Sequence, residues 1–246
     1  EAIAGGRSLI AVILLLPLFL WKGKLAVNRY VLGGALCYAA FNYCFILSTK
    51  LTTSATAIMM QYTAPIYVAL LSWAFLRERI TRSDILCVAV VFGGMLLFFL
   101  DDSGGGTMVG NIIAVFNGIT FAGISIFLRL QKDGNPALSM YLGNAISAVI
   151  GIPFMVSAGL PDLSSLLFLL LAGLLVAVTY TLYAKASTGL SALETVLLPI
   201  IDPILNPVWV FFFLGEAPGV LSILGSVVVL VAVTARVALG IVRQPK

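Results

Sequence analysis

Apolar stretches of about 20 residues follow one another along almost the whole of this 246-residue sequence, and this pattern constrains its fold more than any other feature. An apolar α-helix of about 20 residues spans the hydrocarbon core of a lipid bilayer. The composition agrees, because 61% of the residues are hydrophobic and only 10% are charged, whereas soluble domains carry about 25% charged residues. The sequence therefore predicts an all-α, polytopic membrane protein.

Nine membrane-spanning helices account for the apolar stretches, and only short connections separate them. We place them at 7–21, 30–49, 54–76, 82–100, 108–130, 137–158, 163–184, 191–214 and 219–241. A transmembrane β-barrel is disfavoured, because barrel strands alternate in polarity over segments of about ten residues. The sequence has no histidine, which excludes histidine-based metal sites and proton relays. We expect no cofactor and no nucleic-acid partner.

One segment of the sequence occurs twice. Residues 65–78 read PIYVALLSWAFLRE and residues 203–216 read PILNPVWVFFFLGE, so that Pro65 aligns with Pro203 and Glu78 with Glu216. Internal repeats in a membrane protein are typical of secondary transporters, which bind their substrates near the bilayer midplane at the interface between the repeats. The repeat therefore indicates a transporter.

Basic residues fall almost entirely on one side of the predicted spans. When the connections are assigned alternately, one side holds twelve lysines and arginines and the other holds Arg7 and Lys50. Positively charged connections face the cytoplasm, which predicts a multi-pass protein of the cell (inner) membrane with a cytoplasmic C-terminus. Glu78 would then be cytoplasmic and Glu216 external, so the two repeats have inverted orientations.

The two predicted repeats differ in length. The first, 1–101, holds four spans and the second, 108–243, holds five. The span 108–130 opens the second repeat and has no counterpart in the first. We therefore expect a further helix before Glu1, which would bring the N-terminus back to the cytoplasm. The alternative is a protein with nine spans.

Both copies of the repeated segment resemble the EamA family of the drug/metabolite transporter superfamily. The matching residues are TAPIYVALLSWAFLRERIT at 63–81 and LLPIIDPILNPVWVFFFLGE at 197–216, preceded by Thr-Ser-Ala at 53–55 and Leu-Ser-Ala at 190–192. Arg7 lies where the family often carries an arginine at the start of its second helix. The resemblance implies a ten-helix exporter or permease whose substrates include amino acids, amines, nucleotide-like metabolites and drugs.

Asp202 is the strongest candidate for a transport residue, because it lies near the middle of the span 191–214. An acid at that depth costs about 2.5–3.5 kcal/mol on insertion scales and usually faces a bundle interior or an aqueous cavity. Pro199, Pro203 and Pro207 recur on one helical face, and each removes a backbone donor and kinks the helix. Asn206 shares the face of Asp202. Together these groups suit an ammonium group or a proton, and a purely structural acid is the alternative.

Glu194 is the second carboxylate of the same span. At a helix N-terminus its charge is favoured by the helix dipole, and Lys185 is close enough in sequence to pair with it. The alternative role is a cytoplasmic entry site or a second proton-binding group.

Polar and aromatic residues within other spans form the next set of candidates for substrate or proton binding. Pro65 is expected to kink its helix as Pro203 does. Aromatic side chains suit organic cations, while core packing and helix–helix hydrogen bonds are the alternative roles. The set comprises Asn42, Gln61, Tyr62, Asn117, Asn144 and Tyr180.

Small residues repeat every four positions in two spans, at Gly110, Ala114, Gly118 and Ala122 and at Gly143, Ser147 and Gly151. Such stripes let the backbones of neighbouring helices approach closely. We interpret them as packing surfaces.

These features favour a secondary active transporter of a small polar or amphiphilic metabolite, such as an amino acid, an amine or a drug-like compound. It would work by alternating access, driven by protons or by exchange, and the resemblance favours export. A passive channel or facilitator is the alternative, and an enzyme is disfavoured because clustered catalytic groups are lacking. The expected partners are a small-molecule substrate and the lipid bilayer, and a homodimer is left open.

Overall fold

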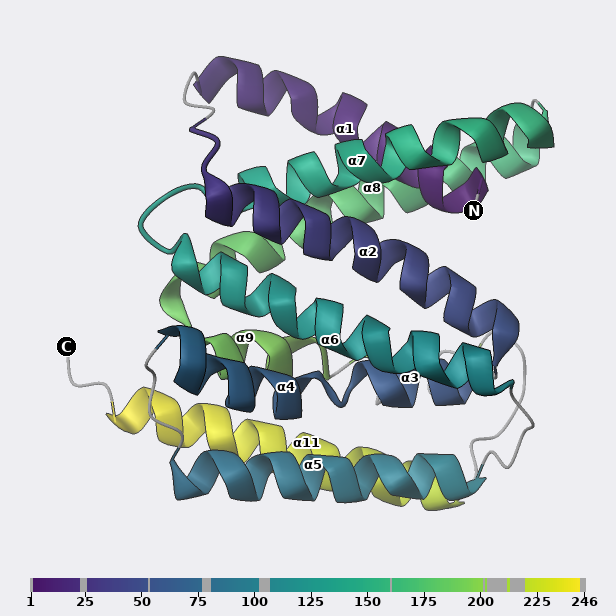
Figure 1. Cartoon of the computed structure of the whole chain (residues 1–246). Helices are drawn as coiled ribbons and strands as arrows, with labels where there is room; N and C mark the ends of the chain where they lie inside the picture. Colours follow the sequence, from purple (N-terminus) through teal and green to yellow (C-terminus); the bar gives the residue numbers. More distant parts are fainter. Residues whose placement is uncertain are drawn as a thin grey trace. The chain divides into compact units, whose positions relative to one another are not determined.

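A computed structural model of the chain describes residues 2–22, 26–52, 54–76, 81–101, 107–159, 161–200, 202, 212 and 220–243. Its elements are all helical and run in the order α1 Ala2–Lys22, α2 Arg29–Leu51, α3 Ser54–Gln61, α4 Ala64–Leu71, the π-helical turn η1 Ser72–Leu76, α5 Arg82–Asp101, α6 Met108–Leu130, α7 Pro136–Ala158, α8 Leu163–Ala186, the 3₁₀ turn η2 Ser187–Gly189, α9 Ala192–Leu197, the 3₁₀ turn η3 Leu198–Ile200 and α11 Val220–Arg243 (Figure 1). The prediction of an all-α fold is confirmed for this described part.

Four of the described helical segments are long and apolar enough to cross a bilayer, judged by length and composition: Arg29–Leu51, Met108–Leu130, Pro136–Ala158 and Leu163–Gly189. The segment Ala2–Pro17 is a shorter apolar helix. The count of nine spans and the equivalence of the repeats stay predictions.

The chain divides into two compact units, each of which takes segments from both predicted repeats. The first unit comprises Glu1–Leu47 and Gly123–Thr195, and the second comprises Ser48–Ala122 and Val196–Lys246. Helix α6 contributes its N-terminal part to the second unit and its C-terminal part to the first. The division by sequence into the repeats 1–101 and 108–243 stays a prediction.

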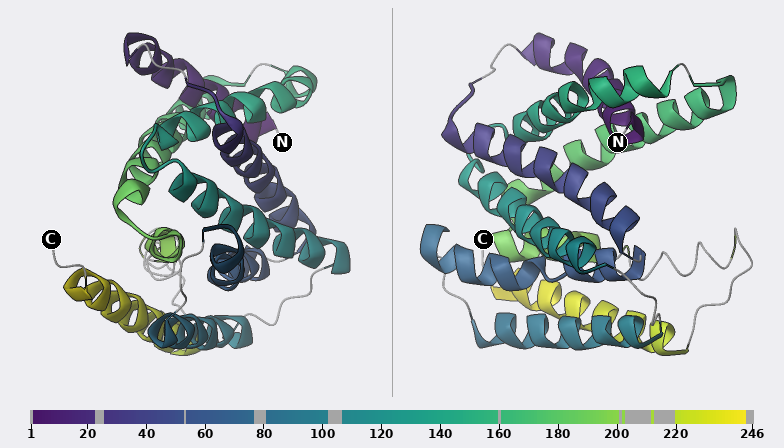
Figure 2. Two further views of the ribbon diagram at one scale, coloured as in Figure 1. Left: turned by 60° about the vertical axis from the view of Figure 1, so that its left-hand side comes forward. Right: turned by 45° about the vertical axis from the view of Figure 1, so that its right-hand side comes forward.

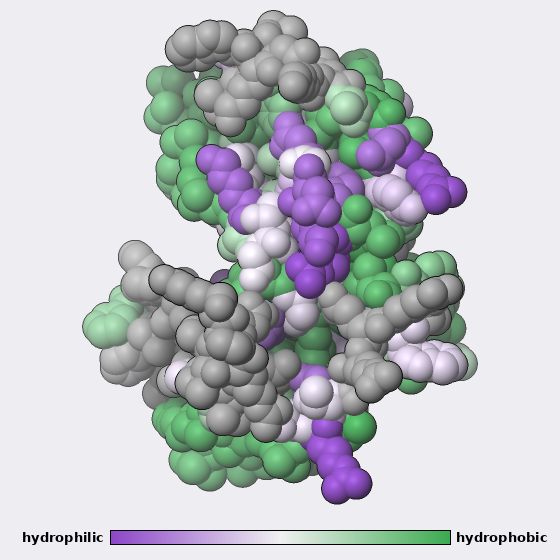
Figure 3. All heavy atoms as spheres, turned by 90° about the vertical axis from the view of Figure 1, so that its left-hand side faces the viewer, coloured by the Kyte–Doolittle hydropathy of each residue, from purple (hydrophilic) through white to green (hydrophobic). Residues whose placement is uncertain are grey.

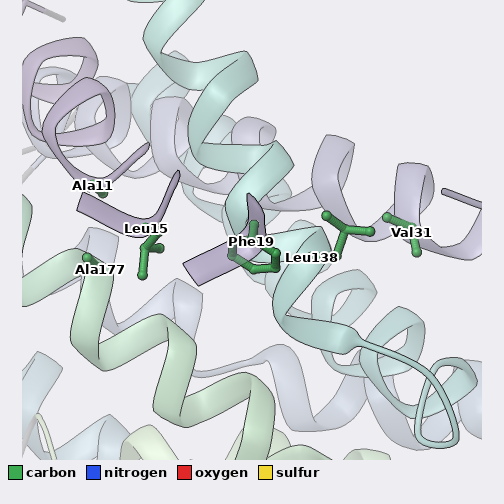
Figure 4. Packing of buried hydrophobic residues seen from close by; sticks show 6 residues of the cluster. All are labelled: Ala11, Leu15, Phe19, Val31, Leu138 and Ala177. Atoms are coloured by element: carbon green, nitrogen blue, oxygen red, sulfur yellow. The ribbon is translucent and has the colours of Figure 1, made fainter. Parts of the chain in front are cut away.

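The core of the first unit lies where α1 packs against α7 and α8. Six buried side chains form its hydrophobic cluster, drawn in Figure 4: Ala11, Leu15, Phe19, Val31, Leu138 and Ala177. The ring of Phe19 also meets that of Tyr141, with centroids 4.6 Å apart. Burial of these side chains fixes the face that α1 turns towards its neighbours.

Glycines allow α1 and α2 to approach α7 at backbone distance. A Cβ atom on Gly5 would lie 2.6 Å from the Cα atom of Gly151, and one on Gly143 would lie 2.7 Å from the ring of Tyr38. In the second unit, a Cβ atom on Gly118 would lie 2.6 Å from the carbonyl oxygen of Met60. The predicted role of the small-residue stripes in close packing is thereby confirmed at these positions.

Helices α5 and α11 lie side by side in the second unit, as both views of Figure 2 show. The contact is close at Gly94, where an added Cβ would lie 2.7 Å from Val229. The thiol of Cys87 donates to the carbonyl oxygen of Ala232 at 3.7 Å.

The predicted span 54–76 is not one continuous helix. Helix α3 ends at Gln61, Tyr62 and Thr63 form a turn, and α4 follows with Pro65 in its first helical turn. Pro65 has no N–H to donate back to Gln61, and a proline is well tolerated only in the first turn of a helix. The helix is therefore interrupted before Pro65, where the sequence predicted a kink.

The predicted span 191–214 is also interrupted. Helix α9 ends at Leu197 and passes into the 3₁₀ turn Leu198–Ile200, which contains Pro199. The first predicted span differs in a smaller way, because α1 begins at Ala2 and places Arg7 within the helix.

Candidate functional site

The two interrupted helices meet in the second unit through one hydrogen bond. The hydroxyl of Tyr62, in the turn between α3 and α4, donates to the carbonyl oxygen of Pro199 at 2.9 Å. In a regular helix that carbonyl would accept from the residue four positions on, which is Pro203 and has no N–H. Tyr62 therefore supplies the donor that the proline sequence removes.

The turn before α4 satisfies its own backbone locally. The N–H of Ile66 donates to the carbonyl of Thr63 at 2.9 Å, and the hydroxyl of Thr63 donates to the carbonyl of Met60 at 2.5 Å. These bonds span three residues, so the interruption is a tight turn with few exposed polar groups. Tyr62 and Thr63 are both buried.

Gln61 and Asn117 form a second polar contact in the same unit. The amide nitrogen of Asn117, on α6, donates to the Oε1 atom of Gln61 at 3.3 Å. Asn117 is fully buried, and its Oδ1 atom has no hydrogen-bond partner. An unsatisfied buried acceptor costs about 1–3 kcal/mol, so this position favours an incoming donor group.

The described residues hold only part of the predicted acidic site. Asp202 is helical and exposed. Asn206, Pro203 and Pro207 lie outside the described residues, so their predicted roles stay predictions.

In the first unit, Arg7 lies against the middle of α2. Its guanidinium donates through Nη2 to the Oδ1 atom of Asn42. The amide nitrogen of Asn42 in turn donates to the hydroxyl of Ser8 at 3.2 Å. Asn42 lies about 20 Å along the helix from Arg29 and about 14 Å from Leu51, at a rise of 1.5 Å per residue. The arginine charge is therefore held far from both ends of α2.

Two further helices bring polar and aromatic groups to α2. The hydroxyl of Tyr38 donates to the Oδ1 atom of Asn144 on α7 at 3.3 Å. The ring of Tyr180 on α8 meets that of Tyr38 edge to face, with centroids 4.8 Å apart. Tyr183 lies beyond Tyr180 and exchanges a hydrogen bond with Ser125 at 3.2 Å. Asn42, Asn144 and Tyr180, predicted separately, thus belong to one polar and aromatic cluster around Arg7 and Tyr38.

Glu194 closes the N-terminus of α9. Its carboxylate accepts from the N–H and the hydroxyl of Ser191 at 2.9 and 3.0 Å, and the Ser191 hydroxyl accepts from the N–H of Glu194 at 3.2 Å. This reciprocal arrangement is a capping box. Lys185 is exposed, and no ion pair between these two described residues is present. Of the roles considered for Glu194, the structure shows the carboxylate at its own helix terminus.

Two hollows lie at opposite ends of the first unit. One, of about 270 Å³, is formed by the end of α1, the start of α7 and the end of α8, with Lys185, Thr188 and Asn135 in its wall. The other, of about 850 Å³, is lined almost entirely by hydrocarbon from α1, α7 and α8. The described residues contain no group of three or more His, Cys, Asp or Glu side chains that could hold a metal ion.

Sequence reasoning did not select Arg7 and Tyr38 as site residues. Arg7 was counted with the connections, yet it is the only charged residue between Ala2 and Trp21. A charge within an apolar stretch is the signal that could have identified it. Tyr38 carries no such signal, and only its contacts with α7 and α8 reveal its position.

A helical protein with polar clusters inside apolar helices, and with helices interrupted at prolines, is a polytopic membrane protein. Residues 1–100 match the EamA-like transporter family. Over 192 residues the chain is 27% identical to a protein of Bacillus subtilis named "Uncharacterized transporter YwfM", covering 74% of this chain and 64% of YwfM. The match over residues 1–100 and this named transporter support assignment to the EamA family of the drug/metabolite transporter superfamily.

Two further similarities support this assignment. The chain is 26% identical over 200 residues to "Pseudopaline exporter CntI" of Pseudomonas aeruginosa, covering 79% of this chain and 69% of CntI. A crystal structure of a protein with 16% sequence identity superposes with a TM-score of 0.80, covering 97% of this chain and 87% of that one. The latter similarity shows the fold alone. The chain spans 64% of the length of YwfM.

Proposed function

We propose that this protein is a secondary active transporter that moves a small polar or amphiphilic metabolite out of the cell by alternating access. Protons or a counter-substrate would drive the movement. Asp202 would bind the coupling proton or a cationic group of the substrate, and Asn206 would assist it. The protein would be a multi-pass protein of the cell (inner) membrane, with this site embedded in the membrane.

The hydrogen bond between Tyr62 and Pro199 carries this proposal. It joins two apolar segments that are both interrupted, and discontinuous helices with polar partners are the usual construction of substrate sites in secondary transporters. Each interruption precedes one copy of the repeated segment, at Tyr62 and Thr63 before Pro65 and at Leu198–Ile200 before Pro203.

The distribution of charge in the first unit supports an orientation in which its basic connections face the cytoplasm. Arg29 begins α2, Lys132 lies between α6 and α7, and Lys185 lies near the end of α8; all three are exposed. The amide of Gln131 donates to the carbonyl of Tyr30 at 3.0 Å, which places the first two of these connections together. Figure 3 looks onto this side and shows hydrophilic residues gathered beside hydrophobic surface. A basic face of this kind suits the cytoplasm.

The names of the relatives favour transport, and one favours export. YwfM is named a transporter and CntI is named an exporter of pseudopaline. We extend only the direction of movement to the present protein.

Proton flux in reconstituted vesicles tests the proposal. Vesicles containing the protein and the pH-sensitive dye pyranine would receive amino acids, amines and organic acids one at a time. For the wild-type protein we expect some compounds to cause a change in internal pH that protein-free vesicles do not show. The Asp202→Asn variant should insert normally and lose at least about nine-tenths of this flux, because an amide cannot take up the proton.

Asp162→Asn is the matched control, since Asp162 is an exposed carboxylate at the start of α8 and should be dispensable for flux. Wild-type flux from Asp202→Asn vesicles would rule out the assigned role of Asp202. Compound movement that equilibrates without any proton movement or exchange would favour the passive channel instead. Absence of flux for every compound would contradict the proposed transport.

A further inference from the structure

Arg7 places a half-buried positive charge among the long helices of the first unit, and the one carboxylate that α9 adds to this unit, Glu194, caps its own helix. Helices α1, α2, α7 and α8 hold no aspartate or glutamate, and neither does α6. Arg7 is half-buried among them and makes no ion pair with any residue that the structure describes. A buried charge is normally paired, because taking it out of water is costly. Among the described residues this charge has no counter-ion, which leaves it available to an anion from outside the chain.

The guanidinium of Arg7 has more donors than the described residues use. Of its five N–H donors, the described residues accept one, at Asn42 Oδ1. Its Nε atom is buried and has no hydrogen-bond partner. An unpartnered donor in a buried position points to a ligand that accepts from the planar edge of the guanidinium, which is the geometry of a carboxylate.

The surroundings of Arg7 match one negative charge on an organic molecule. Asn42, Tyr38 and Asn144 supply uncharged polar groups, and the rings of Tyr38 and Tyr180 supply an apolar wall. Since the cluster offers a single positive charge, a doubly charged, strongly hydrated phosphate group would stay half uncompensated. The buried hydroxyl of Ser147, three residues after Asn144, also has no hydrogen-bond partner among the described residues.

The two unsatisfied atoms, Arg7 Nε and Ser147 Oγ, lie on α1 and α7, which pack closely against each other. Gly5, two residues before Arg7, meets Gly151, one helical turn after Ser147. The hydroxyl of Tyr43 on α2 donates to the carbonyl of Ser147 at 2.7 Å. The crossing of α1, α2 and α7 thus gathers them within one unit.

We propose that the Arg7 guanidinium binds the carboxylate of a small monoanionic or zwitterionic organic solute, with Asn42 orienting it and Tyr38 and Tyr180 forming the apolar wall. The site deepens the proposed function, on which it rests, by naming an organic carboxylate as the substrate class. Asn42 holds one edge of the guanidinium and leaves the others for the ligand.

Binding of matched carboxylate and amide probes to the purified protein tests this site without requiring transport. Organic acids of two to ten carbons, phenylacetate among them, would each be compared with the neutral amide, such as phenylacetamide. Ligand binding raises the apparent thermal stability. For the wild-type protein we expect at least one acid to bind about tenfold or more tightly than its amide, as for a charge-assisted hydrogen bond.

Three variants identify the atoms that bind. Arg7→Gln should abolish the preference for acid over amide, and Arg7→Lys should weaken it about threefold or more, because lysine keeps the charge but loses the planar fork. Asn42→Asp places a fixed carboxylate beside Arg7 and should displace the ligand while the fold is kept. This last variant keeps the test valid if Arg7→Gln fails to fold.

Arg29→Gln is the matched control, because Arg29 is an exposed arginine whose contacts with described residues are to the ring and hydroxyl of Tyr30, at 4.8 and 2.8 Å. It should bind the probes as the wild type does. Wild-type affinity in Asn42→Asp, no acid that exceeds its amide, or tighter binding of phenyl phosphate than of the organic acids would overturn the proposal. Arg7-dependent binding without any flux would leave this site standing and contradict only the proposed transport.

Discussion

The hydroxyl of Tyr62 donates to the carbonyl oxygen of Pro199 at 2.9 Å, joining two apolar segments that are far apart in the sequence. Both segments are broken near this bond, one at the turn of Tyr62 and Thr63 and the other at the 3₁₀ turn Leu198–Ile200. The bond compensates a backbone acceptor that Pro203 leaves without its helical donor. A side chain of the first interrupted segment thus completes the backbone of the second.

Removal of this hydroxyl should destabilise the second unit. The Tyr62→Phe variant leaves the Pro199 carbonyl without its donor, and we expect a loss of about 1–2 kcal/mol in the free energy of unfolding. Thermal unfolding in detergent measures it. Tyr67→Phe is the control, because the Tyr67 hydroxyl has no hydrogen bond to the described residues. Equal unfolding temperatures for the two variants would show that the bond contributes nothing.

Glutamine at position 194 separates the two roles considered for Glu194. A glutamine side chain can still complete a capping box with Ser191, so Glu194→Gln should keep nearly all of the stability and most of the flux. Glu194→Ala removes the cap and should lose about 0.5–2 kcal/mol. Thermal unfolding and vesicle flux are measured on both variants. A stable Glu194→Gln protein without flux would instead assign the carboxylate to proton binding.

A methyl group at the crossing of α1 and α7 should weaken the first unit. The backbones of Gly5 and Gly151 are in direct contact, so Gly151→Ala forces the helices apart and should cost about 1–3 kcal/mol. Gly93→Ala on α5 is the control, because an added Cβ there meets nothing within 4 Å. Since alanine favours helix by up to about 1 kcal/mol over glycine, the control should unfold at the wild-type temperature or above. The reverse order would show that the crossing is loosely packed.

Asp162 should make the start of α8 sensitive to acid. Hydrogen bonds from the Ser164 and Ser165 hydroxyls to its ionised carboxylate lower its pKa from 3.8 to about 2. Because the folded pKa is depressed, its contribution to stability is present above pH 3.8 and is lost as the pH falls towards 2.

A carboxyl-carbon NMR titration measures this pKa directly. Ser164→Ala removes one of the two hydroxyl donors and should raise the pKa of Asp162 towards 3.8. Ser157→Ala is the control, because its hydroxyl donates to the Phe154 carbonyl and not to Asp162. An unchanged Asp162 titration in Ser164→Ala would contradict the assigned cause.

The roles of the small-residue stripes and of the polar residues within spans were predictable. Small or polar residues in an apolar helix need a close contact or a hydrogen-bond partner to offset their free-energy cost. Gly151 and Gly118 do lie at close contacts, and Asn42, Asn144 and Tyr180 do share a cluster. Their partners were not predictable. The periodicity of one helix gives the face on which a residue lies but not the helix that covers this face.

Composition and the length of the apolar stretches determined the all-α membrane fold, because only a helix satisfies its own backbone within a bilayer. The repeated segment likewise indicated the transporter family. Tertiary structure alone decided that Tyr62 supplies the donor for Pro199, that Glu194 caps its own helix, and that Arg7 lies against Asn42 with no counter-ion among the described residues. These are pairings between residues distant in sequence or choices among competing partners, and they depend on which helices pack together.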